Sequence, residues 1–371
     1  MNHLLNTSVQ INDGLHQTSA DGVNMAFDKK YGIMFCVYMP GPQGHYGESR
    51  GRISLTYFPA SQPTNAKTVD IAFGNKEYVP NVISLGDGRV RVLYEKNSTM
   101  EGDHPICYKD YDYLTDTVCE EQIVMLKRDD AIKVPLTESE QFAYLEKNGY
   151  RNHEYLHTEQ ISFGGHTIFD GDDGYLYGAI TSYSAEPILY RSKDQMRTVE
   201  FFAIVPYMAQ YELDYKFLDG KIYAIFRTDK EENSICYTVS EDNGRSWSEP
   251  VPLTSSIQCR PRLIVYQGHI LIAYNYYNTD TGNRPAIQQG RTAVRFLWGE
   301  ATDPNDNICL ADIHSKYGVV NICITEILDD LYMAYSSSVL ALEYQNGNEM
   351  VRGKDAIRYV CLGDLISESQ G

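Results

Sequence analysis

The amino-acid sequence predicts an all-β fold, a six-bladed β-propeller built from four-stranded antiparallel blades. The first observation behind this prediction is a repeated hairpin: an apolar strand, a tight turn and a second apolar strand occur six times along 371 residues. The second is the spacing of the repeats, which is close to the length of one four-stranded blade. Because a lone blade exposes both faces of its sheet, the repeats predict a closed ring and a single domain over residues 1–371.

Asp-Gly or a related pair marks most of the expected turns. This pair between two apolar runs is the strongest short-range signal for a β-hairpin, since glycine adopts the required positive φ without strain. The expected hairpins span residues 25–38, 81–94, 166–177, 215–226, 262–274 and 322–335. Turn positions Gly174, Gly220 and Gly268 lie 46 and 48 residues apart, as expected for blades of similar size.

The interval between Gly88 and Gly174 is longer than the others. It contains Thr137-Glu-Ser-Glu140, a capping-box pattern that marks the beginning of helices. A short inserted helix is therefore expected at roughly 138–148. A seventh blade in this interval stays open as the alternative.

The composition excludes several classes of function. The formal net charge of −18 repels phosphate backbones, so nucleic-acid binding is not expected. No segment approaches the ~20 apolar residues that span a bilayer, and the first residues do not resemble a secretory signal. The eight cysteines are scattered without a Cys-x-x-Cys pair, which favours buried free thiols in a reducing cytoplasm and no zinc site. No cofactor is predicted, and the oligomeric state is not indicated.

A more specific motif follows the fourth hairpin. Ser240, Asp242, Gly244 and Trp247 form the pattern Ser-x-Asp-x-Gly-x-x-Trp. In such a turn the aspartate accepts hydrogen bonds from backbone N–H groups, the glycine allows the reversed bend, and the tryptophan packs between strands. The pattern resembles the Asp-box of the sialidase (bacterial neuraminidase repeat) superfamily, where it is structural and not catalytic. Residues 190–198 resemble a second copy that lacks the glycine and the tryptophan.

The resemblance implies a carbohydrate site at the mouth of the central channel, with an oligosaccharide as the partner. Sialidases bind the substrate carboxylate with three arginines, because a planar guanidinium matches a carboxylate. Arg227 matches the arginine that ends the strand after the hairpin. Arg291 matches the arginine of the next blade, with Arg295 as its competitor. The first-blade arginine belongs to an Arg-Ile-Pro motif, and Val23-Asn24-Met25 stands in that place here.

Further residues near the expected mouth are candidates for substrate contacts. Arg260 and Arg262 begin the fifth blade, and strand alternation directs one of them toward the channel. His166 opens the third blade after two glycines. Arg50 lies in a glycine-rich loop of the first blade, and loops on a rigid scaffold often carry function.

The resemblance also implies catalytic residues. Retaining sialidases use a tyrosine nucleophile at the beginning of the last blade, with a glutamate beside it. Tyr317 matches the tyrosine, and Glu212 lies within one residue of the glutamate. A carboxylate beside a phenol assists loss of the phenolic proton. The acid of the family is an aspartate on a first-blade loop, and His45 and Glu48 occupy the comparable region here.

The leading hypothesis is a glycan-active enzyme: an exo-acting glycoside hydrolase on an acidic or otherwise decorated oligosaccharide. A lyase on uronate-containing sugars is the first alternative. It would neutralise the uronate with Arg227, His45 or His166 and remove the C5 proton with a base such as Tyr317. A non-catalytic sugar-binding propeller is the second, because a fold does not determine a function.

Overall fold

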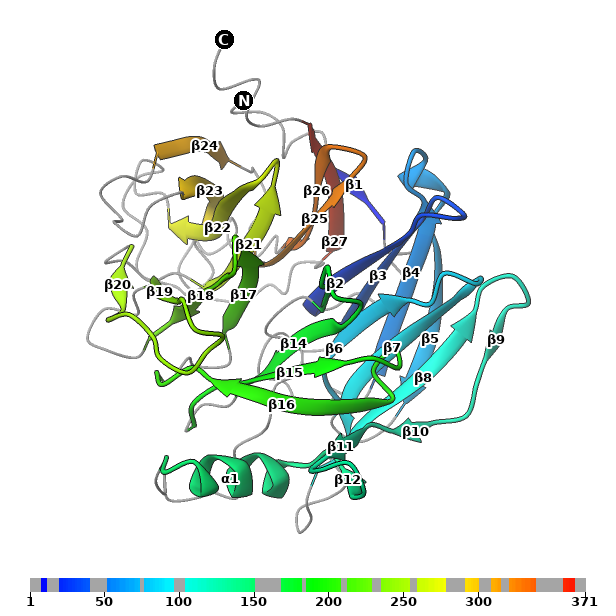
Figure 1. The fold of residues 1–371 in the computed structure, drawn as a ribbon. Coiled ribbons are helices and arrows are strands. Elements are labelled where there is room, and N and C mark those ends of the chain that lie inside the picture. Colours follow the sequence, from blue (N-terminus) through cyan, green and yellow to red (C-terminus); the bar gives the residue numbers. More distant parts are fainter. Residues whose placement is uncertain are drawn as a thin grey trace, which may run out of the picture.

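The structure is a computed structural model. It describes residues 8–11, 20–40, 52–73, 77–96, 104–150, 168–181, 185–207, 212–228, 235–253, 259–277, 291–299, 308–314, 320–337 and 356–363. For some strand residues in these ranges, including 291–299 and 308–314, only the backbone is described. The strands of these ranges form six sheets arranged around a common centre, as the six hairpins predict (Figure 1).

Five of the six blades follow the simple repeat closely, with the first strand innermost. Blade 1 contains β2 (Ala20–Asp28), β3 (Ile33–Pro40), β4 (Arg52–Pro59) and β5 (Lys67–Phe73), with a 3₁₀ turn at Pro63–Asn65. Blade 2 contains β6 (Glu77–Ser84), β7 (Arg89–Lys96), β8 (Ile106–Asp112), β9 (Thr117–Val118) and β10 (Gln122–Ile123). Blade 4 contains β17 (Leu213–Leu218), β18 (Lys221–Arg227), β19 (Ile235–Ser240) and β20 (Val251–Pro252). Blade 5 contains β21 (Cys259–Tyr266), β22 (His269–Tyr277), β23 (Arg291–Gly299) and β24 (Ile308–His314).

Blade 6 is completed by the other end of the chain. It contains β25 (Val320–Ile327), β26 (Asp330–Ser337) and β27 (Ala356–Gly363), and its outer strand is β1 (Val9–Gln10). Val9 pairs with Tyr359 and Gln10 with Arg358 in antiparallel register. The N-terminal strand therefore closes the last blade.

Blade 3 differs from the expected four antiparallel strands. It contains β13 (Phe169–Asp170), β14 (Leu176–Ile180), β15 (Ile188–Ser192) and β16 (Thr198–Ile204), and β11 (Met125–Lys127) and β12 (Lys133–Pro135) extend its outer edge. β11 runs parallel to β16, with Met125 opposite Thr198. The long interval of the sequence thus enlarges the third blade, and no seventh sheet forms in the ranges described above.

The inserted helix is confirmed as α1 (Glu138–Lys147), but its start differs from a capping box. Thr137 is the N-cap residue, and its side chain makes no capping hydrogen bond. Thr137 instead forms an isolated β-bridge with Pro105. The backbone position of Thr137 is therefore set by the neighbouring strand.

Six hydrophobic clusters hold the ring together, one between each pair of neighbouring blades. Val37 and Val92 belong to the cluster between blades 1 and 2, and Leu93 and Ile180 to the cluster between blades 2 and 3. The remaining four clusters join blades 3 to 4, 4 to 5, 5 to 6 and 6 to 1. Each blade therefore buries both faces of its sheet, as the repeats require.

The turn that follows β19 carries the Ser-x-Asp-x-Gly-x-x-Trp motif. Ser240 Oγ accepts a hydrogen bond from the Gly244 N–H at 2.8 Å, and Asp242 Oδ1 accepts one from the Ser246 N–H at 2.8 Å. These bonds lower the pKa of Asp242 to about 2, with the Ser246 hydroxyl as the largest cause. Trp247 donates from Nε1 to the Ile204 carbonyl of blade 3 at 2.9 Å, so this turn also joins two blades.

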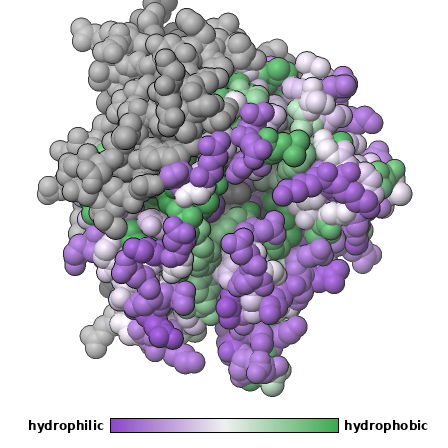
Figure 2. Space-filling view, turned by 45° about the horizontal axis from the view of Figure 1, so that its top comes forward, coloured by the Kyte–Doolittle hydropathy of each residue, from purple (hydrophilic) through white to green (hydrophobic). Residues whose placement is uncertain are grey.

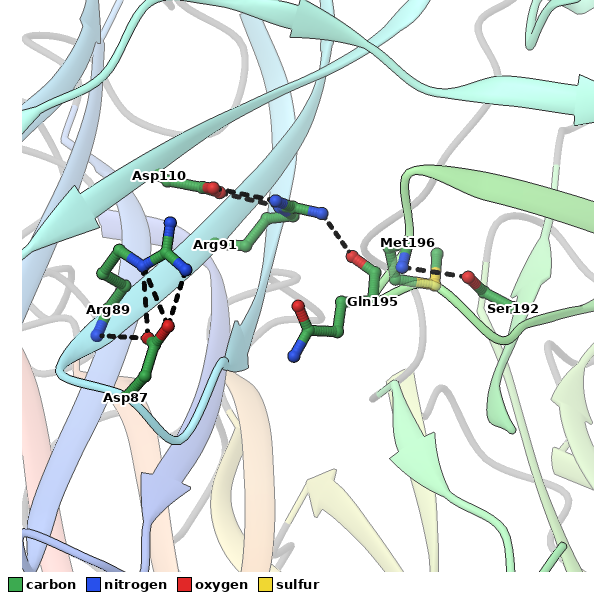
Figure 3. A network of polar contacts seen from close by, with 7 residues as sticks. All are labelled: Asp87, Arg89, Arg91, Asp110, Ser192, Gln195 and Met196. Atoms are coloured by element: carbon green, nitrogen blue, oxygen red, sulfur yellow. Dashed lines mark hydrogen bonds and ion pairs between the residues drawn. The ribbon is translucent and has the colours of Figure 1, made fainter. Parts of the chain in front are cut away.

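The turn after β15 forms the same local bonds without the glycine. Ser192 Oγ accepts from the Met196 N–H at 2.9 Å, and Asp194 Oδ1 accepts from the Thr198 N–H at 2.8 Å. Met196 has a φ of 65° and is fully buried. A positive φ is rare for residues other than glycine, so this turn retains a strained residue (Figure 3).

Two further observations concern the whole of the described chain. In those ranges, no helix has the length and apolar character needed to cross a membrane. The cysteines that the structure describes with side chains form no disulfide: Cys36, Cys107, Cys236 and Cys323 are buried, and Cys119 and Cys361 are exposed.

Candidate functional site at the channel mouth

An arginine and a glutamate meet where the first strand of blade 4 begins and the second ends. Glu212 directly precedes β17, and Arg227 is the last residue of β18. Their side chains form an ion pair, with Arg227 Nη1 3.3 Å from Glu212 Oε1, and their backbones are joined by a 3.0 Å hydrogen bond. The side chains are 17% and 14% exposed, so the pair is partly shielded from water yet reachable.

This contact joins two residues that the sequence assigned to different tasks. Arg227 was expected to bind a substrate carboxylate, and Glu212 to assist a nucleophile. A guanidinium beside a carboxylate orients both groups, and low exposure strengthens that interaction relative to a surface pair. The pair therefore presents a fixed cation and a fixed anion at one end of the central channel.

A second polar group lies deeper, on the inner strand β17. The Asp214 carboxylate accepts hydrogen bonds from the backbone N–H groups of Tyr215 and Leu263, each at 3.0 Å, and lies 3.2 Å from Lys216 Nζ. Lys216 Nζ also lies 4.0 Å from the centre of the Phe169 ring. Burial lowers the pKa of Lys216, and Asp214 opposes this shift. Because Glu212, Asp214 and Lys216 alternate along one strand, they share one face of it.

Five inner strands carry one residue at an equivalent position relative to the hairpin turn, and each is at most 1% exposed. These residues are Asn24, Asn81, Asp214, Arg262 and Cys323. Asn24 Nδ2 donates to the Pro80 carbonyl of blade 2 at 2.9 Å, and Arg262 Nε donates to the Ile322 carbonyl of blade 6 at 2.8 Å. Asn24, Asp214 and Arg262 thus tie their inner strands to the inner strand of the next blade.

Arg262 and Asn24 both belong to this set of buried inner-strand residues, and each bonds to the next blade. Arg262 is 1% exposed between blades 5 and 6, whereas the sequence offered it as a substrate contact. Asn24 is fully buried at the place where the first-blade arginine was sought. Its amide joins blades 1 and 2.

The other predicted site residues fall on segments or side chains that the structure does not describe. His45, Glu48, Arg50, His166 and Tyr317 lie outside the described residues. Arg291 begins β23, where its backbone is opposite Tyr277, and its side chain is likewise outside them.

Sequence reasoning missed Asp214, Lys216 and Glu95. Polar residues alternate with apolar ones from Glu212 to Lys216, and this signal was available in the sequence. Glu95 is the seventh residue of β7 just as Arg227 is the seventh residue of β18, so an alignment of the two hairpin sequences would have found it. The described side chains include no group of three or more His, Cys, Asp or Glu that could hold a metal ion.

The described surface is mostly hydrophilic. Figure 2 shows hydrophobic residues gathered around a hollow near the middle of the face in view. An apolar hollow with a few polar groups is the usual form of a small-molecule site.

Solved structures resemble the chain, although no protein-family model matches it and the curated proteins contain no match. A protein of unknown function from Dyadobacter fermentans is 12% identical, with a TM-score of 0.63 over 95% of this chain and 97% of the other. A Trypanosoma rangeli sialidase in complex with 2,3-difluoro-KDN is 12% identical, with a TM-score of 0.61 over 95% and 54%. The intramolecular trans-sialidase from Ruminococcus gnavus, in complex with oseltamivir carboxylate, is 12% identical, with a TM-score of 0.60 over 96% and 97%.

These similarities establish the fold. The chain spans about half of the length of the Trypanosoma rangeli protein and nearly all of the other two. At 12% identity the likeness concerns the path of the backbone, and the chemistry of the site has to be argued from the residues of this chain.

Proposed function

We propose that this chain, a sialidase-like β-propeller, is a glycan-active enzyme: an exo-acting glycoside hydrolase on an acidic or otherwise decorated oligosaccharide. The single observation that carries the proposal is the partly buried ion pair of Arg227 with Glu212 at one end of the channel. Sialidases are solved with sugar-derived ligands on this fold, which supports a carbohydrate as the substrate. The two serine-aspartate turns support the Asp-box assignment.

In this proposal each residue has one task. Arg227 and Arg291 bind the acidic group of the sugar. Glu212 removes the proton of the nucleophile Tyr317, and His45 or Glu48 protonates the leaving group. His166 and Arg50 contact the substrate, and Arg262 supports the channel from between blades 5 and 6.

A lyase acting on uronate-containing sugars is the second candidate, and Asn24 favours it. Because Asn24 is buried and bonded to Pro80, blade 1 offers no arginine at the place where the family holds one. A site with fewer arginines suits a uronate, which a lyase neutralises before a base removes the C5 proton.

The compartment is part of the same proposal. Four of the described cysteines are buried and form no disulfide, and buried thiols are common where the environment is reducing. We therefore assign the enzyme to the cytoplasm, where oligosaccharides rather than polymers would be its substrates.

The test measures the two chemistries side by side. The purified chain is incubated with 4-methylumbelliferyl glycosides and with unsubstituted acidic oligosaccharides, and fluorescence and absorbance near 235 nm are followed together. Fluorescence release that Arg227→Ala abolishes is the expected result. A rise in absorbance alone would replace the hydrolase by the lyase.

Arg89→Ala is the matched control. Arg89 lies beside the hairpin turn at the opposite end of blade 2, where it pairs with Asp87 and is 38% exposed. The Arg89→Ala variant loses the same positive charge as Arg227→Ala but leaves the residues at the channel mouth unchanged. The activity of this variant should therefore equal that of the wild type. Sugar binding without turnover, unchanged by Tyr317→Phe, would instead indicate a binding propeller.

A further inference from the structure

Glu95 occupies in blade 2 the position that Arg227 occupies in blade 4. Each is the seventh residue of the second strand of its blade, at the same distance from the hairpin turn. Arg91, Leu93 and Glu95 alternate along β7 and face blade 3, since Arg91 bonds to blade 3 and Leu93 packs in the cluster between the two blades. Glu95 therefore lies between blades 2 and 3, toward the mouth.

The Glu95 carboxyl is fully buried, and neither of its oxygens has a hydrogen-bond partner among the residues described. A buried polar group without a partner is costly, and an ionised carboxylate is far more costly than a neutral one. Such a group in a native protein requires an explanation.

The N-terminal half of α1 lies directly beside Glu95. The Lys96 N–H donates to the Pro105 carbonyl at 3.1 Å, and Pro105 forms a β-bridge with Thr137, the residue before the helix. The first residue of α1 is Glu138, which is 1% exposed. The backbone contacts thus bring two buried carboxyls together from blade 2 and from α1.

The buried face of α1 is polar at its beginning and apolar at its end. It consists of Glu138, Gln141 and Leu145. Leu145 packs on Ile188 and Ile204 of blade 3. Gln141 is fully buried, and neither its amide oxygen nor its nitrogen has a partner in the described part of the chain. Leu145 therefore docks the end of α1 through apolar contacts. Docking at the beginning of α1 depends instead on whether the buried carboxyl of Glu95 is protonated.

The charges around Glu95 favour its neutral form. Burial raises the pKa of Glu95 well above its usual value, and the Glu138 charge raises it further. In the neighbouring strand, Ile106 lies opposite Glu95 and Tyr108 lies opposite Leu93, and the buried His104 stands just before this strand. The cation on the same strand, Arg91, is already held by two hydrogen bonds from its guanidinium to Asp110.

We propose that a protonated Glu95, buried near Glu138, allows α1 to dock against blades 2 and 3, and that loss of this proton at alkaline pH releases the helix. The docked helix keeps Glu95 protonated, whereas an undocked helix exposes it to water and lets it ionise. Docking is therefore strongest below the pKa of an exposed glutamate and weakens as the pH rises toward the pKa of the docked state. Over that interval the docking constant falls about tenfold per pH unit, because one proton is released.

Hydrogen–deuterium exchange of residues 138–147 tests this proposal on the full chain. Protection is measured from about pH 5 to about pH 9 and corrected for the intrinsic rates of exchange. The protection of α1 in the wild type is expected to fall with rising pH. In Glu95→Gln, which keeps the shape and removes the titration, it should stay constant.

Glu146→Gln is the matched control, because Glu146 lies on the exposed face of the same helix. This variant should follow the wild type at every pH. If Glu95→Gln does not fold, Glu138→Gln serves instead: without the Glu138 charge the pKa of Glu95 in the docked state is less raised, so the protection of α1 should fall less over the same pH range than in the wild type. Wild-type protection that does not change with pH, or that changes equally in Glu95→Gln, would overturn the proposal.

Discussion

The guanidinium of Arg91 in blade 2 donates from Nη1 to the Gln195 carbonyl of blade 3 over 2.5 Å, across 104 residues of sequence. Arg91 Nε and Nη2 donate to the two oxygens of Asp110 at 2.7 and 2.8 Å. Its guanidinium also lies 4.0 Å from the centre of the Tyr108 ring. Figure 3 shows that Gln195 belongs to the turn between Ser192 and Met196, so one buried arginine joins blade 2 to this turn.

Asp110→Asn is expected to lower the free energy of unfolding by about 3–5 kcal/mol, because the buried Arg91 charge would lose its counter-charge. Urea denaturation followed by circular dichroism measures this loss. Asp87→Asn is the control, since the Arg89–Asp87 pair is 38% and 48% exposed and contributes about 0–1 kcal/mol. Equal losses in the two variants would contradict a special role of the buried pair.

Gly244→Ala is expected to lower the free energy of unfolding by about 1–3 kcal/mol. Gly244 has a φ of 81°, and an added Cβ would lie 2.4 Å from Ala203 Cβ of blade 3. Gly220→Ala is the control that measures backbone strain alone. Gly220 also has a positive φ, 75°, but an added Cβ there would meet no atom within 4 Å. Gly220→Ala should cost about 1 kcal/mol. A thermal unfolding series that ranks Gly220→Ala as the more damaging change would refute this account.

The Asp242 turn should lose its contribution to stability in acid. Because the folded-state pKa of about 2 lies below the ordinary value of 3.8, the contribution is present above that value and disappears as the pH falls toward 2. Asp242→Asn should therefore be less stable than the wild type at neutral pH, and the difference should vanish in acid. Thermal melts at a series of pH values check this. A difference that persists unchanged down to pH 2 would rule it out.

Glu212→Gln should lower kcat by about 10²–10⁴-fold on a substrate that the wild type turns over, as expected when a general base is removed. KM should not rise, because Arg227 loses its internal carboxylate and remains available to the acidic sugar. Steady-state kinetics separates the two parameters. A rise in KM at constant kcat would reassign Glu212 to substrate binding.

Much of the fold could be predicted because the sequence patterns that indicate hairpins and helices involve residues close together in the chain. The hairpin at Asp219 and Gly220 depends on the chemistry of two residues, and both have positive φ in the structure. The helix was likewise found within one residue of its end. The pairing of β11 with β16 joins residues far apart in sequence, and no local pattern indicates which outer edge a short strand will extend.

The orientation of Arg262 shows why the site was harder to predict. The register of β21 shifts between Cys259 and Arg262, so alternation counted from the beginning of the strand does not give the side that each residue faces. Similar shifts occur in β2, β6 and β25. By contrast, β17 has no such shift, and alternation from Asp214 to Lys216 is reliable there.

The pairing of β1 with β27 has a kinetic consequence. Ser8 Oγ lies 2.8 Å from the Tyr335 hydroxyl, and the Ile11 N–H donates to the Ile357 carbonyl at 2.9 Å, so residues 8–11 cannot take their place in blade 6 until residues 335–357 have been synthesised. Contacts of such high sequence separation slow folding, and the half-finished ring presents an open strand edge meanwhile. A circular permutant that carries residues 8–11 behind residue 363 would turn this longest-range contact into a local one and should refold faster.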